Sequence, residues 1–374
     1  MTLINNPFIV YGYKGPDYFC DRKKETKKIL STLRSERNIT LVAPRRMGKT
    51  GLISHVFNHI RSNNPEVRCF YIDIYATHSL DELVRALGEA VIGKLDTVTR
   101  SALRGIQSFF SAWRPKISID QSTGMPSVEL DIKSGEGHES LRQIFEYMRQ
   151  SGRRCYVAID EFQQILEYPE TGVEALIRSY IQFIPNVYFI FAGSQQHVIE
   201  QMFMSANRPF FQSSMVIALQ GIDKSEYLTF ANHHLASQGR SMDAATFNNI
   251  YNLAGGVTWY VQSVLHAIYD HREQAVDSAL VDEVVEELIE EQTLSYQSYC
   301  SWLTANQHAL LRAIAAEGIV KAPLSQSFLK THQLSAASSV KSALKALEVK
   351  QLISRTPEGY TVSDLFFALW LRKK

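Results

Sequence analysis

The stretch ITLVAPRRMGKTGLI constrains the fold of this chain more than any other segment. It ends in Gly48-Lys49-Thr50, the close of a loop of the form G-x-x-x-x-G-K-[ST], whose backbone N–H groups surround phosphates. Such a loop needs a buried strand before it and a helix after it. The apolar run NITLVA predicts the strand, and apolar residues at helical spacing over 52–60 predict the helix. The chain is therefore predicted to be an α/β protein with a parallel sheet flanked by helices, as in P-loop nucleotide-binding folds.

The loop departs from the motif at its first position, which is Ala43 instead of glycine. Glycine serves there for a tight backbone turn, and alanine can often meet that need. A chance Gly-Lys-Thr is the alternative, and the flanking strand and helix argue against it. Lys49 is expected to contact the β- and γ-phosphates, and Thr50 to hold Mg²⁺. The predicted phosphate-binding residues are Pro44, Arg45, Arg46, Met47, Gly48, Lys49, Thr50 and Gly51.

A second apolar run, Tyr156–Ile159, ends in an acidic pair. Open α/β sheets bind ligands at the carboxyl ends of their strands. We therefore expect Asp160 to hold Mg²⁺ together with Thr50, and Glu161 to act as the general base that polarises an attacking water. The alternative is that Asp160 only caps a helix that begins near Phe162.

Further apolar runs complete the predicted sheet. Residues 186–192 are predicted to form one strand, followed by Ser194 and Gln195, which are both candidates to reach a γ-phosphate or the catalytic water. The alternative is an ordinary turn in which Ser194 caps a helix. Residues 68–75 and 213–223 are predicted to supply two more strands.

The bulk composition is that of an ordinary globular protein, with 45% hydrophobic and 21% charged residues among 374. A formal net charge of +1 gives no global attraction to nucleic acid. Four scattered cysteines predict neither zinc nor a disulfide framework. The N-terminus has no signal-peptide pattern, and no apolar run is long enough to span a membrane. We expect a cytoplasmic protein.

Together, the motifs give the chain a family resemblance. FCDRKKETKKILSTL, APRRMGKTGLI, VAIDEFQQI, FIFAGSQ, RPFFQSSMVIALQGI and LAGGVTWYVQ occur in this order over roughly residues 5–290. The chain resembles the archaeal-type AAA-superfamily ATPases of the STAND group, which have many bacterial members of unassigned role. The resemblance implies an ATPase that binds ATP or ADP with Mg²⁺, with a helical lid and a C-terminal winged helix.

The resemblance also implies roles for residues outside the loop. Phe19 and Arg22 match an element that lies against the adenine and the nucleotide. Lys49, Glu161 and Ser194 are the implied catalytic residues. Gly256 matches a Gly-Gly turn of the lid that contacts nucleotide, although Thr258 stands where the family usually has proline. Arg208 lies near the position of a family arginine.

Three domains are expected. The ATPase core spans 1–222 and carries a β-hairpin insertion at about 112–135, on the edge of the sheet. A helical lid spans 223–295. A winged-helix domain spans 296–374, where ten Lys and Arg against four Asp and Glu give a net charge of +6.

Two functions follow from these patterns. The first is slow ATP hydrolysis as a conformational switch, in which nucleotide state couples the core to the lid and winged helix, with assembly into oligomers on nucleotide binding as an open question. The second is a DNA-binding or adaptor protein with a static structural nucleotide. The helix within SAASSVKSALKALEVKQLI would be the recognition helix for DNA, while protein contact or intramolecular packing is its alternative role.

Overall fold

The computed structural model describes residues 5–92, 95, 135–272, 275–356 and 358–373, and the backbone of residues 113–119 and 126–132. The chain forms two compact units. One contains residues 9–227, and the other contains residues 228 onward together with the segment that ends at Phe8.

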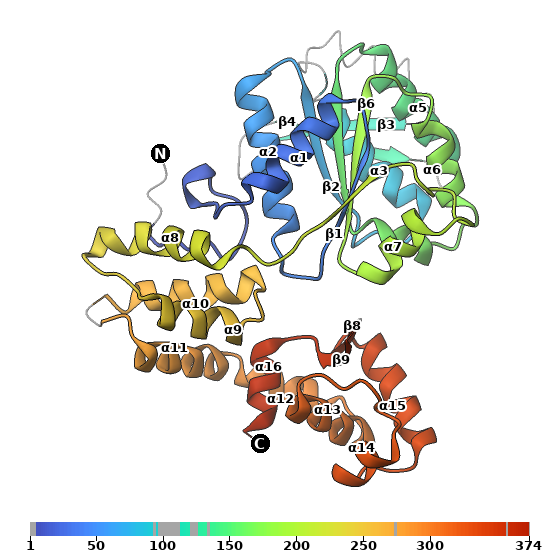
Figure 1. The fold of residues 1–374 in the computed structure, drawn as a ribbon. Helices are drawn as coiled ribbons and strands as arrows, with labels where there is room; N and C mark the ends of the chain where they lie inside the picture. Colours follow the sequence, from blue (N-terminus) through green and yellow to red (C-terminus); the bar gives the residue numbers. More distant parts are fainter. Residues whose placement is uncertain are drawn as a thin grey trace. The chain divides into compact units, whose positions relative to one another are not determined.

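The first unit is built on a parallel five-stranded sheet in the order β2-β5-β6-β1-β7 (Figure 1). Its strands are β1 (Ile39–Val42), β2 (Arg68–Asp73), β5 (Cys155–Asp160), β6 (Val187–Gly193) and β7 (Met215–Ala218). Every residue of β1, β5 and β6 is buried, which is why these segments read as continuous apolar runs in the sequence. The expected α/β class and parallel sheet are confirmed.

Helices cover the sheet on both faces. In Figure 1, α1 and α2 lie on one side of the strands, and α3, α5 and α6 lie on the other. Among the described residues, the helices of this unit are η1 (Pro16–Tyr18), α1 (Lys23–Arg34), α2 (Lys49–Asn63), α3 (Leu80–Val91), α5 (Gly137–Gln150), η2 (Phe162–Glu167), α6 (Val173–Ile181) and α7 (Gln196–Met204). The helix α8 (Lys224–Leu235) crosses the boundary to the second unit.

An aromatic cluster anchors the segments that follow β5 and β6. Phe162 is fully buried. Its ring centroid lies 4.6 Å from that of Phe191 and 5.4 Å from that of Phe210. Phe203 packs against all three. Phe162 directly follows the acidic pair of β5, so its burial fixes the backbone that presents Glu161.

The expected hairpin is present, but it does not lie on the edge of the large sheet. β3 (Trp113–Ile119) and β4 (Pro126–Ile132) pair antiparallel in a two-stranded sheet of their own. The strand β4 packs against α3 instead of hydrogen-bonding to β2, the edge strand. The expected turn at Thr123-Gly124 lies outside the described residues.

The second unit is helical and ends in a helix–strand–strand–helix segment. Its elements are η3 (Ala236–Gln238), α9 (Ala244–Leu253), α10 (Thr258–Asp270), α11 (Ser278–Glu291), α12 (Thr293–Ser301), α13 (Ala305–Glu317), α14 (Gln326–Thr331), α15 (Ala337–Val349), β8 (Ile353–Thr356), β9 (Gly359–Val362) and α16 (Leu365–Arg372). The antiparallel pair β8–β9 is the expected β-wing, and α15 is the helix expected before it.

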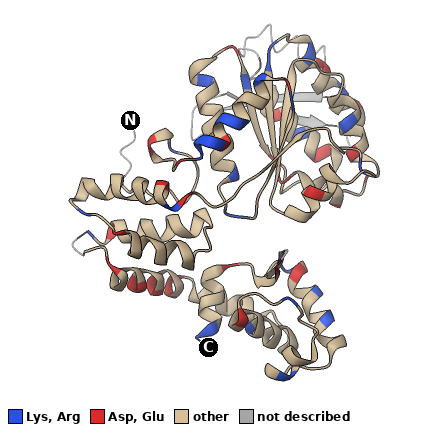
Figure 2. Ribbon diagram, viewed as in Figure 1, with Lys and Arg blue, Asp and Glu red and all other residues tan. Residues whose placement is uncertain are grey.

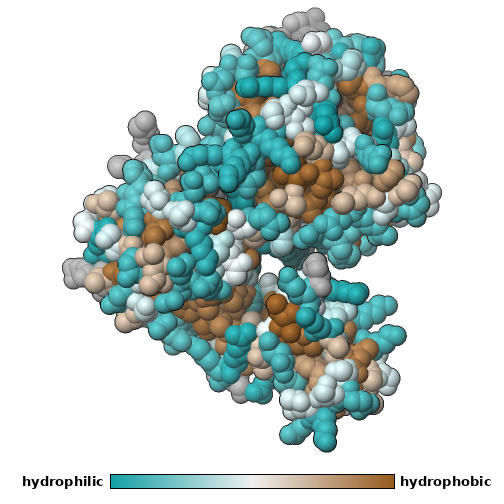
Figure 3. Space-filling view, viewed as in Figure 1, coloured by the Kyte–Doolittle hydropathy of each residue, from teal (hydrophilic) through white to brown (hydrophobic). Residues whose placement is uncertain are grey.

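The surface drawn in Figure 3 is largely hydrophilic, with apolar residues gathered in small patches. Within the described ranges, none of the helices combines the length and the apolar character needed to cross a bilayer.

Candidate nucleotide-binding site

The loop between β1 and α2 begins at the carboxyl end of β1, which lies between β6 and β7 in the sheet. Ala43 is 1% exposed and is not among the residues with positive φ, so the first position of the motif does not require glycine in this chain. Two later positions do adopt the left-handed region, Arg46 at φ 67° and Gly48 at φ 87°. Alternation of conformations of this kind turns successive N–H groups toward one point and forms an anion-binding concavity.

Lys49 lies inside this loop and is 7% exposed. Its Nζ donates to the carbonyl oxygens of Ala43, at 3.1 Å, and Pro44, at 3.4 Å. Burial lowers the pKa of Lys49, an effect opposed by the charges of Asp160 and Glu161. Within the described residues no ion pair engages this ammonium group. The two carbonyl oxygens hold it in place, where it could pair with a phosphate.

Asp160 and Thr50 meet at the ends of β5 and α2. The Thr50 hydroxyl donates to Asp160 Oδ2 at 2.9 Å, and the Glu161 N–H donates to Oδ1 at 3.0 Å. Asp160 is 4% exposed, and it does not cap the following helix, whose N-cap position is Glu161. Hydroxyl and carboxylate oxygens side by side form the hard donor set that Mg²⁺ prefers. The residues therefore fit a magnesium–nucleotide complex.

Tyr71 is a third partner of this carboxylate that the sequence reasoning missed. Its hydroxyl donates to Asp160 Oδ2 at 2.8 Å. Burial, followed by the charge of Asp160, raises the pKa of Tyr71, so the phenol stays a donor at neutral pH. The available signal was strand alternation, because Tyr71 and Asp73 share one face of β2 and Asp73 pairs in register with Asp160.

Glu161 is held by an unexpected set of donors. Its backbone is left-handed, at φ 55°, and its Oε2 accepts from Ser194 Oγ at 2.7 Å and from the Ser194 N–H at 3.3 Å. The amide of Gln163 donates to the same oxygen at 2.5 Å. Ser194 therefore contacts the predicted base, and the N-cap position of α7 belongs to Gln195.

Gly193 makes room for this arrangement. A Cβ at Gly193 would lie 2.2 Å from Gln163 Oε1 and 2.6 Å from Ile199 Cγ1. Gln163 itself is 5% exposed. A larger residue at the end of β6 would therefore displace the amide that holds Glu161.

Phe19 and Arg22 lie beside the loop, as the resemblance implied. The ring of Phe19 stacks on His55 of α2, with centroids 4.4 Å apart and planes 15° apart. Arg22 is 3% exposed, and its guanidinium donates to the carbonyl oxygens of Met47, at 3.0 Å, and Gln220, at 2.5 Å. Arg22 thus joins the phosphate loop to the chain segment that leaves β7.

Two further predicted residues are Arg208 and Gly256. Arg208 forms an ion pair with Glu174, with N and O 2.9 Å apart. Burial raises the pKa of Glu174, and the charge of Arg208 opposes that rise. Gly256 belongs to the second unit, at φ 71°, where an added Cβ would lie 2.9 Å from the Tyr251 hydroxyl. A nucleotide contact of Gly256 stays a prediction.

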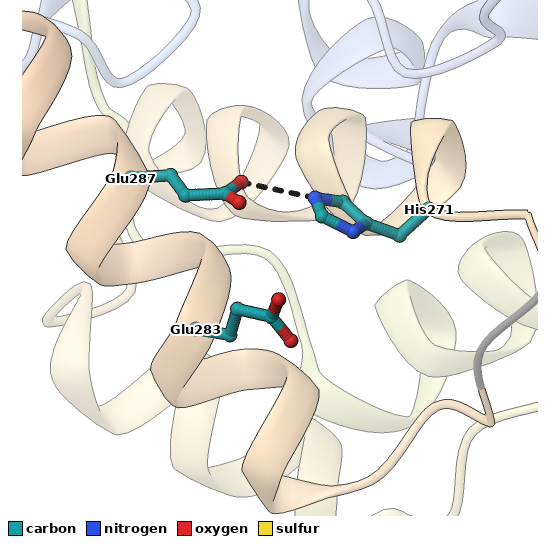
Figure 4. A group of neighbouring side chains, drawn as sticks. All are labelled: His271, Glu283 and Glu287. Carbon is teal, nitrogen blue, oxygen red and sulfur yellow. Dashed lines mark hydrogen bonds and ion pairs between the residues drawn. The ribbon is translucent and has the colours of Figure 1, made fainter.

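One other group of potential metal ligands lies in the second unit. His271, at the end of α10, faces Glu283 and Glu287 of α11, and its Nε2 lies 2.9 Å from a Glu287 oxygen (Figure 4). Both carboxylates are exposed, and the contact with His271 accounts for the orientation of Glu287. We assign no ion to this group.

Comparisons with known proteins agree with this geometry. Residues 19–264 match the model of an ATPase domain found predominantly in Archaea, and residues 294–373 match a probable winged helix domain. No curated protein sequence matches the chain.

Solved structures with a similar fold include three proteins. The Walker-type ATPase PABY2304 of Pyrococcus abyssi is 17% identical, with a TM-score of 0.63, and the match covers 98% of this chain and 99% of that one. ORC2 of Aeropyrum pernix, in ADPNP–ADP complexes, is 15% identical, with a TM-score of 0.59 and coverages of 98% and 95%. ORC1 of Aeropyrum pernix, in complex with DNA, is 14% identical, with a TM-score of 0.57 and coverages of 98% and 96%.

Proposed function

The chain belongs to the family of ATPase domains found predominantly in Archaea, and from this premise we propose that it hydrolyses ATP slowly, with Mg²⁺, as a conformational switch of the STAND type. One observation carries the proposal. A buried lysine, a hydroxyl–carboxylate pair and a restrained glutamate meet at the carboxyl edge of a parallel sheet. The four cysteines of the chain are free thiols in the structure, which suits a protein of the reducing cytoplasm.

Each residue has a distinct role in this proposal. Lys49 binds the β- and γ-phosphates, and the Thr50 hydroxyl and Asp160 hold the cation. Mg²⁺, when bound, supplies positive charge that offsets the charge developing on the phosphoryl oxygens. Glu161 accepts a proton from the attacking water. Ser194 and Gln163 orient Glu161 by donating to its Oε2.

Two contacts support slow turnover and coupling. The guanidinium of Arg208 forms an ion pair with Glu174, so in this structure it does not stabilise the charge that develops during phosphoryl transfer. Arg22 binds the carbonyl of Met47 in the loop and that of Gln220 in the segment leading to α8. A shift of the loop on phosphate binding would therefore act directly on the segment that connects the core to the rest of the chain.

Calorimetric titration with ATP and ADP, with and without Mg²⁺, tests the site. We expect micromolar binding by the wild type and its loss in Lys49→Ala. We also expect slow phosphate release that both Lys49→Ala and Glu161→Gln abolish, because these residues supply charge and the base. Unchanged hydrolysis in both variants contradicts the proposal. If the wild type binds nothing, mass spectrometry of the denatured protein shows whether ADP is already trapped.

A second candidate function is a DNA-binding or adaptor role with a static nucleotide. The observation in its favour is α15 of the winged-helix segment, which exposes Lys341 and Lys345. Salt-sensitive binding of duplex DNA by residues 296–374 would favour the DNA role. No binding at low salt would favour an adaptor. Light scattering with and without ATP tests whether nucleotide also drives assembly.

A further inference from the structure

Positive charge is concentrated on one helix of the first unit. Although the whole chain has a formal net charge of +1, α1 contains Lys23, Lys24, Lys27, Lys28 and Arg34 against the single acid Glu25, which gives a net charge of +4 for this helix. Figure 2 shows these basic positions as blue turns along α1. The proposed function uses none of them.

Part of this charge lines a hollow between α1 and α2, with a volume of about 370 Å³. Lys23, Lys27 and Arg34 line it from α1, and His55 and His59 line it from α2. These residues are four or seven positions apart along their helices, so they form one face of each helix. The lining also contains two hydroxyl groups and no carboxylate.

The basic side chains that line the hollow differ in whether they pair with carboxylates. Lys23 has carboxylate partners, Asp21 at 3.4 Å and Glu226 at 3.5 Å. Lys27 and Arg34 are exposed, and no ion pair among the described residues engages either of them. They stand seven residues apart, which is two turns or about 10 Å along the helix. The opposite face of α1 is packed into the core through Ile29 and Leu33.

We propose that the hollow between α1 and α2 binds the phosphate backbone of a nucleic-acid strand. Lysine, arginine, serine and threonine side chains are the groups that contact phosphates in such complexes. The row of cations is open to solvent along its length, whereas pockets for small ligands enclose most of their ligand. An extended polyanion therefore fits this surface better than a compact phosphate does. This site lies in the ATPase core and is distinct from α15.

Fluorescence anisotropy on the full chain without added nucleotide tests the proposal. The probes are labelled duplex DNA, single-stranded DNA and single-stranded RNA of one sequence, titrated between about 50 and 200 mM salt. The test variant is Lys27→Ala with Arg34→Ala, and the matched control is Arg85→Ala with Arg272→Ala, which removes two exposed arginines elsewhere on the chain. A third variant, Lys341→Ala with Lys345→Ala, reports on binding through α15. Comparison of the three probes identifies which nucleic acid supplies the phosphates.

We expect the test variant to bind more weakly and its plot of log affinity against log salt to become shallower. Loss of two phosphate contacts lowers the slope by about 1.8 for duplex and about 1.4 for single strands. The control variant should keep the slope of the wild type. Thermal unfolding of all three variants confirms that they are folded.

Three results overturn the proposal. One is an unchanged affinity and slope in the Lys27→Ala, Arg34→Ala variant. Another is a loss confined to the Lys341→Ala, Lys345→Ala variant, which assigns binding to the winged-helix segment. The third is displacement of the probe by polyglutamate as efficiently as by unlabelled DNA, which points to an acidic protein. Because nucleotide is absent, failure of ATP binding would leave these outcomes intact and would count only against the proposed function.

Discussion

At the scale of single residues, Ala43 shows how a motif can lose one of its glycines without losing its geometry. The backbone of Ala43 needs no positive φ, whereas that of Gly48 does, at 87°. The two positions of one motif therefore carry different constraints. At Gly48, where the loop turns into α2, the backbone conformation favours glycine. At Ala43, where the loop leaves β1, the residue only has to be small enough to be buried.

Two substitutions test this difference. We expect Ala43→Gly to leave ATP affinity unchanged and to lower the free energy of unfolding by about 0.5–1 kcal/mol, because glycine gains freedom in the unfolded chain. Gly48→Ala should instead weaken ATP binding, because its Cβ strains the left-handed turn at the phosphates. Urea denaturation and calorimetry measure the two effects. Equal losses of ATP affinity would contradict the assignment.

Gln163 offers a second test at this scale. We expect Gln163→Leu to lower kcat for ATP hydrolysis by about ten- to a hundredfold, because a small misplacement of a catalytic group has effects of that size. KM should stay near that of the wild type, since Gln163 contacts Glu161 and not the loop. The matched control is Gln164→Leu, whose amide donates to the Thr77 carbonyl instead. A raised kcat would contradict this role, because it would show that the hydrogen bond from Gln163 holds Glu161 back from the reaction.

At the scale of elements, the strands could be predicted because full burial leaves continuous apolar runs. The same reasoning found the loop, Asp160 and Glu161. It could not find Gln163 as a partner of Glu161, because that contact depends on how η2 turns back beneath Gly193. It also misplaced the hairpin, because period-two alternation gives the strands but not the element against which they pack.

Burial of the strands makes a prediction about the cysteines. Cys69 on β2 and Cys155 on β5 are buried, and burial raises the pKa of each thiol to about 12. Cys20 is also buried, whereas Cys300 is partly exposed. Burial also raises the pKa of Cys300, but its partial exposure gives a reagent access to the sulfur, so we expect Cys300 to react faster than the other three thiols at pH 8.

The measurement is the number of thiols labelled in native and denatured protein. All four should react in denaturant, and the three buried thiols should remain slow in the native state up to about pH 10, since reactivity rises only as pH approaches a raised pKa. Fast labelling of Cys69 or Cys155 at pH 8 would show that the edge of the sheet opens.

At the scale of the whole molecule, the order of residues along the chain does not match their division into the two compact units. The segment that ends at Phe8 belongs with residues 228 onward, because the ring of Phe8 packs edge-on against Phe230, His234 and Tyr269. These contacts join residues more than 200 positions apart, so no local pattern could reveal them. The expected core of residues 1–222 therefore included a segment that belongs to the second unit, and the expected boundaries at 222 and 295 remain predictions from sequence.

The proposed switch is tested at this scale through Arg22. If Arg22 passes a movement of the loop to Gln220, trypsin cleavage at the exposed Lys224 should change when ATP binds the wild type. We expect Arg22→Ala to retain ATP binding with reduced affinity and to lose this nucleotide-dependent change. The free energy of unfolding should also fall, by about 1–3 kcal/mol, because two carbonyls and Glu25 lose a buried donor.

The matched control is Arg85→Ala, which removes an exposed arginine from α3. This variant should show the cleavage pattern of the wild type with and without ATP. If Arg22→Ala still binds ATP and keeps the nucleotide-dependent change at Lys224, the coupling does not pass through the guanidinium. The loop would then communicate with the connecting segment through β1 and β7, whose parallel pairing joins Val42 to Ala218.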